Sequence, residues 1–288
     1  MTAPTFRKRL VPKLLLLPLG AWLVCFALIP MIYGVWLSLH NAFIENLSQP
    51  SWIGLGNYVY LIKDPAFARA LGWSLRFALI SVTAQMVVGV AMAWFFNRPI
   101  PAKGLWITLL LTPMVVSPAL IGTMFRLLFS ECVGPIQFLL NPLTKGNPLL
   151  GPDLVMLTII VADSISSTPF VFINIYAALQ SVSHELMEAA TVDGASAWQR
   201  FWRITVPLIL PITIVTWLMR ILAAFLVFEL VFSLTGGGPG NMTQSATIYI
   251  YRRAFSRSDF GMANAASVTL GLLLLGPSLL MLRRMVRR

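Results

Sequence analysis

The chain has 288 residues, of which 58% are hydrophobic and 11% are charged, and its mean hydropathy is +0.81. Soluble domains carry about 25% charged residues and roughly 45–50% apolar ones, so this composition excludes an ordinary soluble protein. The net charge of +11 does not indicate nucleic-acid binding, because the basic residues lie at the ends of apolar segments, where they set topology. The sequence therefore predicts an all-α integral membrane protein with no nucleic-acid partner.

Long apolar runs predict six transmembrane helices, since a helix needs about 20 apolar residues to cross a bilayer. The predicted spans in chain order are 14–37, 73–96, 105–129, 154–179, 207–232 and 262–282. The first run is too long for the apolar part of a signal peptide, and no small-residue cleavage site follows it. We therefore interpret it as a span, preceded by a charged segment at 1–13.

The predicted spans are joined by three outer loops and by shorter inner connections. The outer loops cover residues 38–72, which are rich in aromatic side chains, and residues 130–153 and 233–261, which are rich in Gly, Pro and Asn. Residues 73–282 are predicted to form a five-helix core, interrupted on the inner side by the polar stretch 181–206. A basic tail, 283–288, follows the last span.

The distribution of Lys and Arg predicts the orientation of the chain. Twelve of the 21 basic residues fall in 1–13, 97–103, 181–206 and 283–288, whereas six fall in the outer loops. Because basic residues are retained on the cytoplasmic side, both termini and the stretch 181–206 are predicted to be cytoplasmic. The expected location is the inner (plasma) membrane of the cell, with lipid around the spans.

The stretch 184–207 is the longest polar interruption in the C-terminal half, and its local signals read helix, turn, helix. Ser181 or Ser183 can cap a first short helix, and Gly194 can end it in the left-handed conformation. Ser196 can cap a second short helix before the fifth span begins. The alternative is a solvated loop between two spans.

Two charged residues are predicted at membrane depth, Asp163 in the fourth span and Arg220 in the fifth. A charge at the bilayer centre costs several kcal/mol unless it is paired or faces water, so both should face the protein interior or a wet cavity. Two interpretations stay open. The residues either line a path for a polar solute or form a structural pair, and Glu229 is a further possible partner of Arg220.

The sequence carries no motif for nucleotide binding or catalysis. It lacks a G-x-x-x-x-G-K-[ST] loop, an H-E-x-x-H helix and a G-x-S-x-G turn. Cys25 and Cys132 have no metal-binding spacing, and we assign them no role. The chain is therefore predicted to be non-catalytic and to hold no cofactor, so uphill transport would draw on a partner or an ion gradient.

The polar stretch also carries a recognisable spaced motif. Glu188-Ala189-Ala190, Gly194 four positions later and Ile204-x-Val206-Pro207 resemble the EAA loop of binding-protein-dependent ABC importer permeases, E-A-A-x3-G-x9-I-x-L-P, with Val206 in place of the usual Leu. Three further blocks resemble the carbohydrate-type permeases (the maltose, trehalose and glycerol-3-phosphate group). They are 53–58 with 64–65, then 234–239, and 259–266.

The resemblance implies a type I ABC importer permease fold with six transmembrane helices, which forms half of a path for a sugar or sugar-derived solute. It implies a second homologous permease in a heterodimer, two ATPase subunits that bind ATP and Mg, and an external solute-binding protein that meets the loops 38–72 and 233–261. The residues implied in ATPase coupling are Leu186, Met187, Glu188, Ala189, Ala190, Asp193 and Gly194. Those implied in the substrate path are Asp163, Ser166, Ser167, Phe170, Arg220, Ala223, Ala224, Leu226 and Val227.

Two other functions are compatible with six spans. An ion-coupled secondary transporter could use Asp163 as a relay, and a membrane scaffold would transport nothing. Ala223 and Ala224 are small and stand where relatives can carry polar residues. The full binding site for the solute could therefore lie in this chain or in its partner permease. Sugars, sugar acids, polyols and phospho- or sulfo-sugars all fit the sequence.

Overall fold

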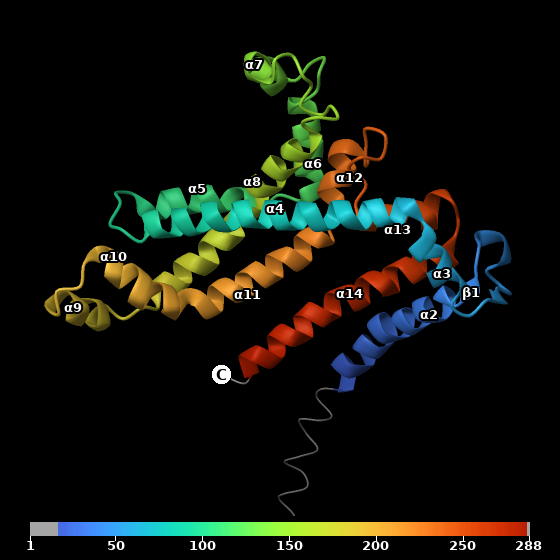
Figure 1. The fold of residues 1–288 in the computed structure, drawn as a ribbon, viewed down its shortest axis with the longest axis horizontal. Helices are drawn as coiled ribbons and strands as arrows, with labels where there is room; N and C mark the ends of the chain where they lie inside the picture. Colours follow the sequence, from blue (N-terminus) through green and yellow to red (C-terminus); the bar gives the residue numbers. More distant parts are fainter. Residues whose placement is uncertain (1–16, 287–288) are drawn as a thin grey trace, which may run out of the picture. The chain divides into compact units, whose positions relative to one another are not determined.

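The computed structural model describes residues 17–286 and is mostly helical, which confirms the predicted all-α membrane class (Figure 1). Among the described residues, five helices are long and apolar enough to cross a membrane, and a bent helix pair makes a sixth candidate. The described residues form two compact units. We call residues 68–249 the central unit, and residues 17–67 together with 250–286 the terminal unit.

The central unit is built on α4 (Pro65–Phe96), a helix of 32 residues, most of which lies in this unit. The helices that follow are α5 (Lys103–Val115), α6 (Pro118–Leu128), α7 (Pro135–Thr144), α8 (Val155–Gln180), α9 (His184–Val192), α10 (Ala197–Arg200), α11 (Val206–Phe225), α12 (Glu229–Thr235) and α13 (Ala246–Tyr251). Helices α5 and α11 both pack on α8, and α12 packs along α6 (Figure 1).

A compact apolar core holds α4, α8 and α11 together. Phe172 and Ile175 of α8 are fully buried there, against Phe96 of α4 and Ile209 of α11. The helices approach closely at Gly89, where a Cβ atom would come within 2.6 Å of a side-chain carbon of Val171. Close packing of this kind stabilises helices in a membrane, where burial of apolar surface gives little advantage over lipid.

The terminal unit pairs α2 (Ile29–Ser38) with α14 (Phe260–Val286). Its remaining elements are a π-helical turn η1 (Val24–Leu28), the strands β1 (His40–Asn41) and β2 (Ser51–Trp52), a 3-10 turn η2 (Ile44–Asn46), α3 (Gly56–Lys63) and a π-helical turn η4 (Arg252–Ser256). The two strands are antiparallel, with His40 opposite Trp52.

Hydrogen bonds to backbone carbonyls tie the segment after α2 to α3 and to the start of α14. The Asn57 amide donates to the carbonyl oxygens of Ser38 at 2.8 Å and His40 at 2.9 Å. The Gly261 N–H donates to the Ala42 carbonyl at 3.0 Å. A Cβ at Gly261 would lie only 2.4 Å from the His40 carbonyl oxygen, so the position has no room for a side chain. These contacts give a structural reason for the sequence blocks around residues 57 and 261.

Arg253 links two helix N-termini in the same unit. Its guanidinium lies 2.5 Å from Asp64 Oδ2 and 3.7 Å from Asp259 Oδ2. With the other oxygen, Asp64 accepts from the Ala66 N–H at 2.8 Å and Asp259 accepts from the Met262 N–H at 3.0 Å, so each carboxylate also caps a helix. We call these three side chains the arginine clamp.

Three predicted span boundaries differ from the structure. Helix α4 begins at Pro65 rather than at residue 73, because the Asp64 cap and the following proline favour a helix start there. The predicted span 105–129 is two helices bent by 94°, because Ser117 precedes Pro118 and is held out of the helical conformation. The predicted span 207–232 ends as a helix at Phe225.

The end of α11 frees backbone groups that the structure satisfies in other ways. After Phe225 the chain leaves the helical conformation, and α12 starts only at Glu229. The Val227 carbonyl in the gap accepts the Thr247 hydroxyl at 2.6 Å. The predicted outer loops also contain helical pieces, α7 in 130–153 and α13 in 233–261.

Candidate functional site

The polar stretch begins with the short helix α9, whose start is set by a single cap. Ser183 has an extended backbone, and its hydroxyl accepts the Leu186 N–H at 3.2 Å. Of the two serines that the sequence allows, the structure therefore uses Ser183. Glu185 lies in the first turn, where a carboxylate interacts favourably with the helix dipole.

Gly194 ends α9 in the left-handed conformation, as predicted from the sequence, with φ of 75°. Its N–H donates to the Thr191 carbonyl at 3.1 Å, and the Ala195 N–H donates to the Ala190 carbonyl at 2.9 Å. This pair of bonds is the Schellman arrangement, which satisfies carbonyls that would otherwise be left without partners at the helix end. The chain turns sharply here, so we call residues 183–196 the bend.

The helix after the bend is much longer than the sequence indicates. Ser196 caps α10 in a reciprocal pair with Gln199, with hydrogen bonds of 3.2 Å and 2.8 Å. From Ala197 the helix runs without a break through the π-helical turn η3 (Phe201–Thr205) to Phe225, over 29 residues. We call it the long helix.

The prediction of a separate short second helix is therefore wrong. It assumed that Pro207 starts a new helix, because proline lacks an N–H and crowds the preceding turn. In the structure the turn before Pro207 is widened to a π-turn, in which the Val206 N–H bonds to the Phe201 carbonyl. A π-turn changes the local bonding pattern without ending the helix, so the helix can continue past the proline.

Two contacts hold the bend against its surroundings in the central unit. Arg200 of α10 donates to the hydroxyl of Thr191 on α9, which ties the two sides of the bend together. The ring of Phe201 packs edge-on against Trp94 of α4, with centroids 4.5 Å apart. The bend is thereby attached to the ends of two long helices rather than suspended between them.

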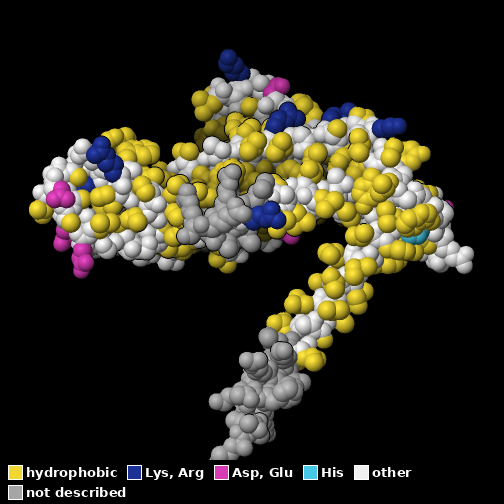
Figure 2. Space-filling view, turned by 60° about the horizontal axis from the view of Figure 1, so that its bottom comes forward, with side chains coloured by type: hydrophobic (Ala, Val, Ile, Leu, Met, Phe, Trp, Pro, Cys, Tyr) yellow, Lys and Arg dark blue, Asp and Glu magenta, His cyan; other side chains and the backbone are white. Residues whose placement is uncertain are grey.

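The seven residues implied in coupling do not all lie on the surface. Leu186, Glu188, Ala189, Asp193 and Gly194 are exposed, Met187 is half-buried, and Ala190 is buried. Ala190 therefore packs inside the bend and offers no surface to a partner. Val192, which is 88% exposed on α9, was not predicted, although its position in an apolar–polar pattern could have indicated it. Figure 2 shows acidic side chains gathered at the end that carries α9.

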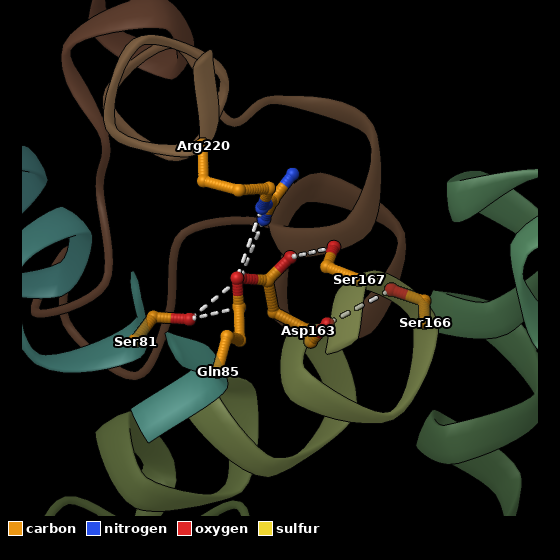
Figure 3. Close-up of polar contacts among 6 residues, drawn as sticks. All are labelled: Ser81, Gln85, Asp163, Ser166, Ser167 and Arg220. Carbon is orange, nitrogen blue, oxygen red and sulfur yellow. Dashed lines mark hydrogen bonds and ion pairs between the residues drawn. The ribbon is translucent and has the colours of Figure 1, made fainter. Parts of the chain in front are cut away.

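A buried polar cluster lies where α4, α8 and α11 meet (Figure 3). Asp163 is 6% exposed, and its Oδ2 accepts from the Ser81 hydroxyl at 2.6 Å and from the Gln85 amide at 2.7 Å. The same oxygen lies 3.6 Å from the Arg220 guanidinium. The other oxygen, Oδ1, accepts from Ser167 at 3.2 Å, and Arg220 Nε donates to the Gln85 side-chain oxygen at 2.9 Å. We call these five residues the buried ion-pair cluster.

The sequence left two carboxylates, Asp163 and Glu229, as possible partners of Arg220. Arg220 interacts with Asp163, whereas Glu229 is exposed at the start of α12. Ser81 and Gln85 were not predicted from the sequence. Both are completely buried and lie four residues apart on α4, which places them on one face of the helix. A polar pair at this spacing inside an apolar span is the signal that could have revealed them.

The other residues implied in the substrate path are scattered. The Ser166 hydroxyl donates back to the Asp163 carbonyl of its own helix at 3.0 Å, and Ala224 is buried. Phe170 and Val227 are half-buried, whereas Leu226 is 43% exposed. The structure thus brings together Asp163, Ser167 and Arg220, and does not bring the remaining members into the same cluster.

A comparison with protein families matches residues 85–287, which include the bend and all of the buried ion-pair cluster except Ser81, to the family described as the binding-protein-dependent transport system inner membrane component. The chain belongs to this family. It is 32% identical over 271 residues to the trehalose transport system permease protein SugA of Mycobacterium tuberculosis, covering 93% of this chain and 86% of that protein. The trehalose/maltose transport system permease protein MalF of Thermococcus litoralis is 28% identical, with 96% and 94% covered.

A solved structure shows that this inner membrane component has the fold of an ABC transporter chain. The crystal structure of a bacterial ABC transporter involved in the import of the acidic polysaccharide alginate matches with a TM-score of 0.83 at 24% identity. The match covers 98% of this chain and 96% of the other. The predicted family and fold are confirmed, and the chain is a multi-pass membrane protein.

Proposed function

We propose that the chain is the permease subunit of an ATP-driven importer in the inner membrane, with both termini in the cytoplasm, and that it forms half of the path for a sugar or sugar-derived solute. Its membership of the family and the trehalose and maltose relatives support this proposal. The observation that carries it is the long helix, which joins the exposed bend to the buried ion-pair cluster without interruption.

The long helix has the dimensions of a lever. At 1.5 Å per residue, its 29 residues extend about 43 Å, and Arg220 lies about 35 Å from Ala197. A partner that pushes the bend would tilt this helix, and the tilt would reach α4 and α8 through the cluster. Closure of ATPase subunits would thereby change which side of the membrane the path faces, by a hinge motion.

The exposed side of α9 fits a contact with ATPase subunits. Leu186 is 43% exposed and Val192 88% exposed, with the carboxylate of Glu188 also on the surface. Val192 and Glu188 are four residues apart and share one side of the helix, and an exposed apolar side chain next to a charge suits docking in a cleft of a partner. We infer that the importer contains two ATPase subunits, which bind ATP and Mg. This chain itself holds no cofactor and catalyses no reaction.

A second homologous permease would complete the path, and an external binding protein would deliver the solute. The terminal unit contains a pocket of about 640 Å³, lined in part by Asn41, Tyr60 and Lys63. Next to it α3 exposes Tyr60 at 68% and Ile62 at 82%. Apolar side chains exposed on a loop outside the spans are typical of an interaction surface, and we assign this one to the binding protein.

The roles within the path follow from burial. Asp163, Ser167 and Arg220 are satisfied by one another and by α4, so we infer that they position the spans. The wall that meets the solute would comprise the more accessible members, Ser166, Phe170, Ala223, Leu226 and Val227. An ion-coupled mechanism is disfavoured, because each oxygen of Asp163 already accepts a hydrogen bond.

Two substitutions that change the charge of the bend test its proposed role in coupling. Glu188→Lys and Gly194→Asp should abolish sugar uptake in cells while the protein stays in the membrane. The matched control is Glu131→Lys, which reverses an exposed charge in the loop before α7 and should leave uptake unchanged. Normal uptake in both bend variants would refute the coupling role. Uptake that survives ATP depletion and stops with an uncoupler would instead support an ion-coupled transporter.

A further inference from the structure

The base of the long helix exposes two tryptophans and an arginine. Trp198 is 69% exposed and Trp202 is 50% exposed, and their rings lie 5.5 Å apart, so they share one side of the helix. Arg203 is exposed and makes no ion pair with any described residue. The protein-facing side is different, because Phe201 contacts Trp94 there and Thr205 is 3% exposed.

The length of the helix places these side chains relative to the bilayer. The 20 residues of α11 extend about 30 Å, which is the thickness of the hydrocarbon layer. When α11 fills that layer, Trp202 lies about 6 Å beyond its end and Trp198 about 12 Å beyond. The headgroup layer on each side is about 5–8 Å thick, so Trp202 lies within it, whereas the backbone of Trp198 lies about 4 Å or more beyond its outer border.

We propose that Trp202 and Arg203, with Trp198 packed against Trp202 on the aqueous side, form an anchor in the headgroup layer of an anionic phospholipid membrane. Indole rings are enriched at this depth, because one edge is polar and the body is apolar. Arg203 supplies the charge for lipid phosphates, and its aliphatic stem allows the guanidinium to reach them. Arg98, which is exposed just after α4, adds a second positive charge near the same level, because Trp94 on that helix contacts Phe201.

The surface above the anchor agrees with a lipid environment. Leu208 is 50% exposed and Ile212 is 40% exposed, and they lie four residues apart, so exposed apolar side chains share one side of α11. Apolar residues followed by tryptophan and then by arginine form the sequence expected of a helix that leaves a bilayer. The anchor would hold the base of the long helix at a constant depth, so that a push on the bend tilts the helix instead of sliding it.

Spin labels report this depth directly. In the full chain with Cys25 and Cys132 replaced by Ser, single labels are introduced by Trp198→Cys and Trp202→Cys. Matched controls are Leu208→Cys within α11 and Val192→Cys on α9, which are also exposed. In nanodiscs of phosphatidylcholine and phosphatidylglycerol, collisions with oxygen and with an aqueous nickel reagent should rank the depths 208, 202, 198 and 192, from deepest to most aqueous.

Two results would overturn the proposal. A label at 202 that matches the aqueous behaviour of 192 would show that this side of the helix faces water. A label at 202 that is shielded from both reagents, in nanodiscs or in native membranes, would show that a protein partner covers it. Neither result would affect the proposed importer function, because the depth measurement needs no transport.

The role of Arg203 is tested in the same labelled chains. Replacing about a third of the phosphatidylcholine with phosphatidylglycerol should slow the motion of the label at 202 through closer headgroup contact. The Arg203→Gln chain should lose most of this response, whereas Lys145→Gln, which removes a charge from the loop after α7, should keep it. An equal response in all three chains would show that anionic lipid is not recognised at Arg203.

Discussion

At the residue scale, Asp163 shows how a charge is tolerated inside a helical membrane protein. Its carboxylate is buried, yet three hydrogen bonds and one ion pair meet its two oxygens. Burying a charge without such partners is expensive, so the cluster is stable only when it is complete. The sequence indicates that Asp163 and Arg220 need partners or water, and an ion pair between them is one of the two arrangements it leaves open. It does not predict which neutral side chains complete the cluster.

Removing one charge of the pair should therefore harm the protein more than removing both. Arg220→Met leaves Asp163 with an uncompensated charge and should cost about 3–5 kcal/mol of stability. Adding Asp163→Leu to the same chain should recover much of the loss. Thermal unfolding in detergent measures both. A double variant that is less stable than Arg220→Met alone would contradict the account of the pair.

At Gly261 the constraint is steric rather than electrostatic, because the position has no room for a side chain. The Cβ of an alanine would meet the His40 carbonyl oxygen at 2.4 Å, so Gly261→Ala must displace the chain between α2 and α3. The expected loss of stability is about 1–3 kcal/mol. Gly271→Ala on the same helix meets nothing within 4 Å and should be neutral or slightly stabilising. Equal unfolding temperatures for the two variants would show that the junction yields easily.

At the element scale, the long helix is the feature that the sequence described least well. Ser196 and Gly194 were identified correctly, because capping and left-handed positions depend on local chemistry. The prediction that a separate short helix ends before Pro207 was wrong, because a neighbouring π-turn lets the helix continue past the proline. Local signals indicate where a helix can start or stop, and the wider packing decides whether it does.

If the long helix works as a lever, making it flexible should separate ATP hydrolysis from transport. Ile212→Gly with Ile214→Gly weakens the helix between the bend and the cluster, at two exposed positions, by about 1 kcal/mol per residue relative to alanine. Uptake should fall several-fold while ATP hydrolysis by the reconstituted importer continues. The alanine pair at the same positions is the control and should keep both activities.

At the scale of the whole molecule, the fold class was accessible from the sequence and the contacts between distant segments were not. Apolar runs of sufficient length indicate helical spans, and the spaced motif indicates the family. The 94° bend between α5 and α6 and the arginine clamp were missed. Asp64 and Arg253 are 189 positions apart in the chain, and no local pattern relates them. The substrate path is the least predictable part, since its wall depends on side-chain directions.

The division into two compact units suggests that they respond separately to damage. Arg253→Gln removes the charge that faces Asp64 and Asp259, so the helix starts that these two carboxylates cap should open more often. Backbone hydrogen exchange should speed up in the first turns of α4 and α14. Exchange in α8, within the central unit, should stay unchanged. Faster exchange throughout the chain would mean that the two units unfold as one.

The arginine clamp has a consequence for anyone who recombines this chain with a relative. Each aspartate uses one oxygen for a backbone N–H and the other for the same guanidinium, so a glutamate of equal charge would be one carbon too long for the double task. Segments around residues 64, 253 and 259 therefore have to be transplanted as a set. In a chimera that takes two of these segments from one parent and the third from another, the three side chains of the arginine clamp need not fit one another.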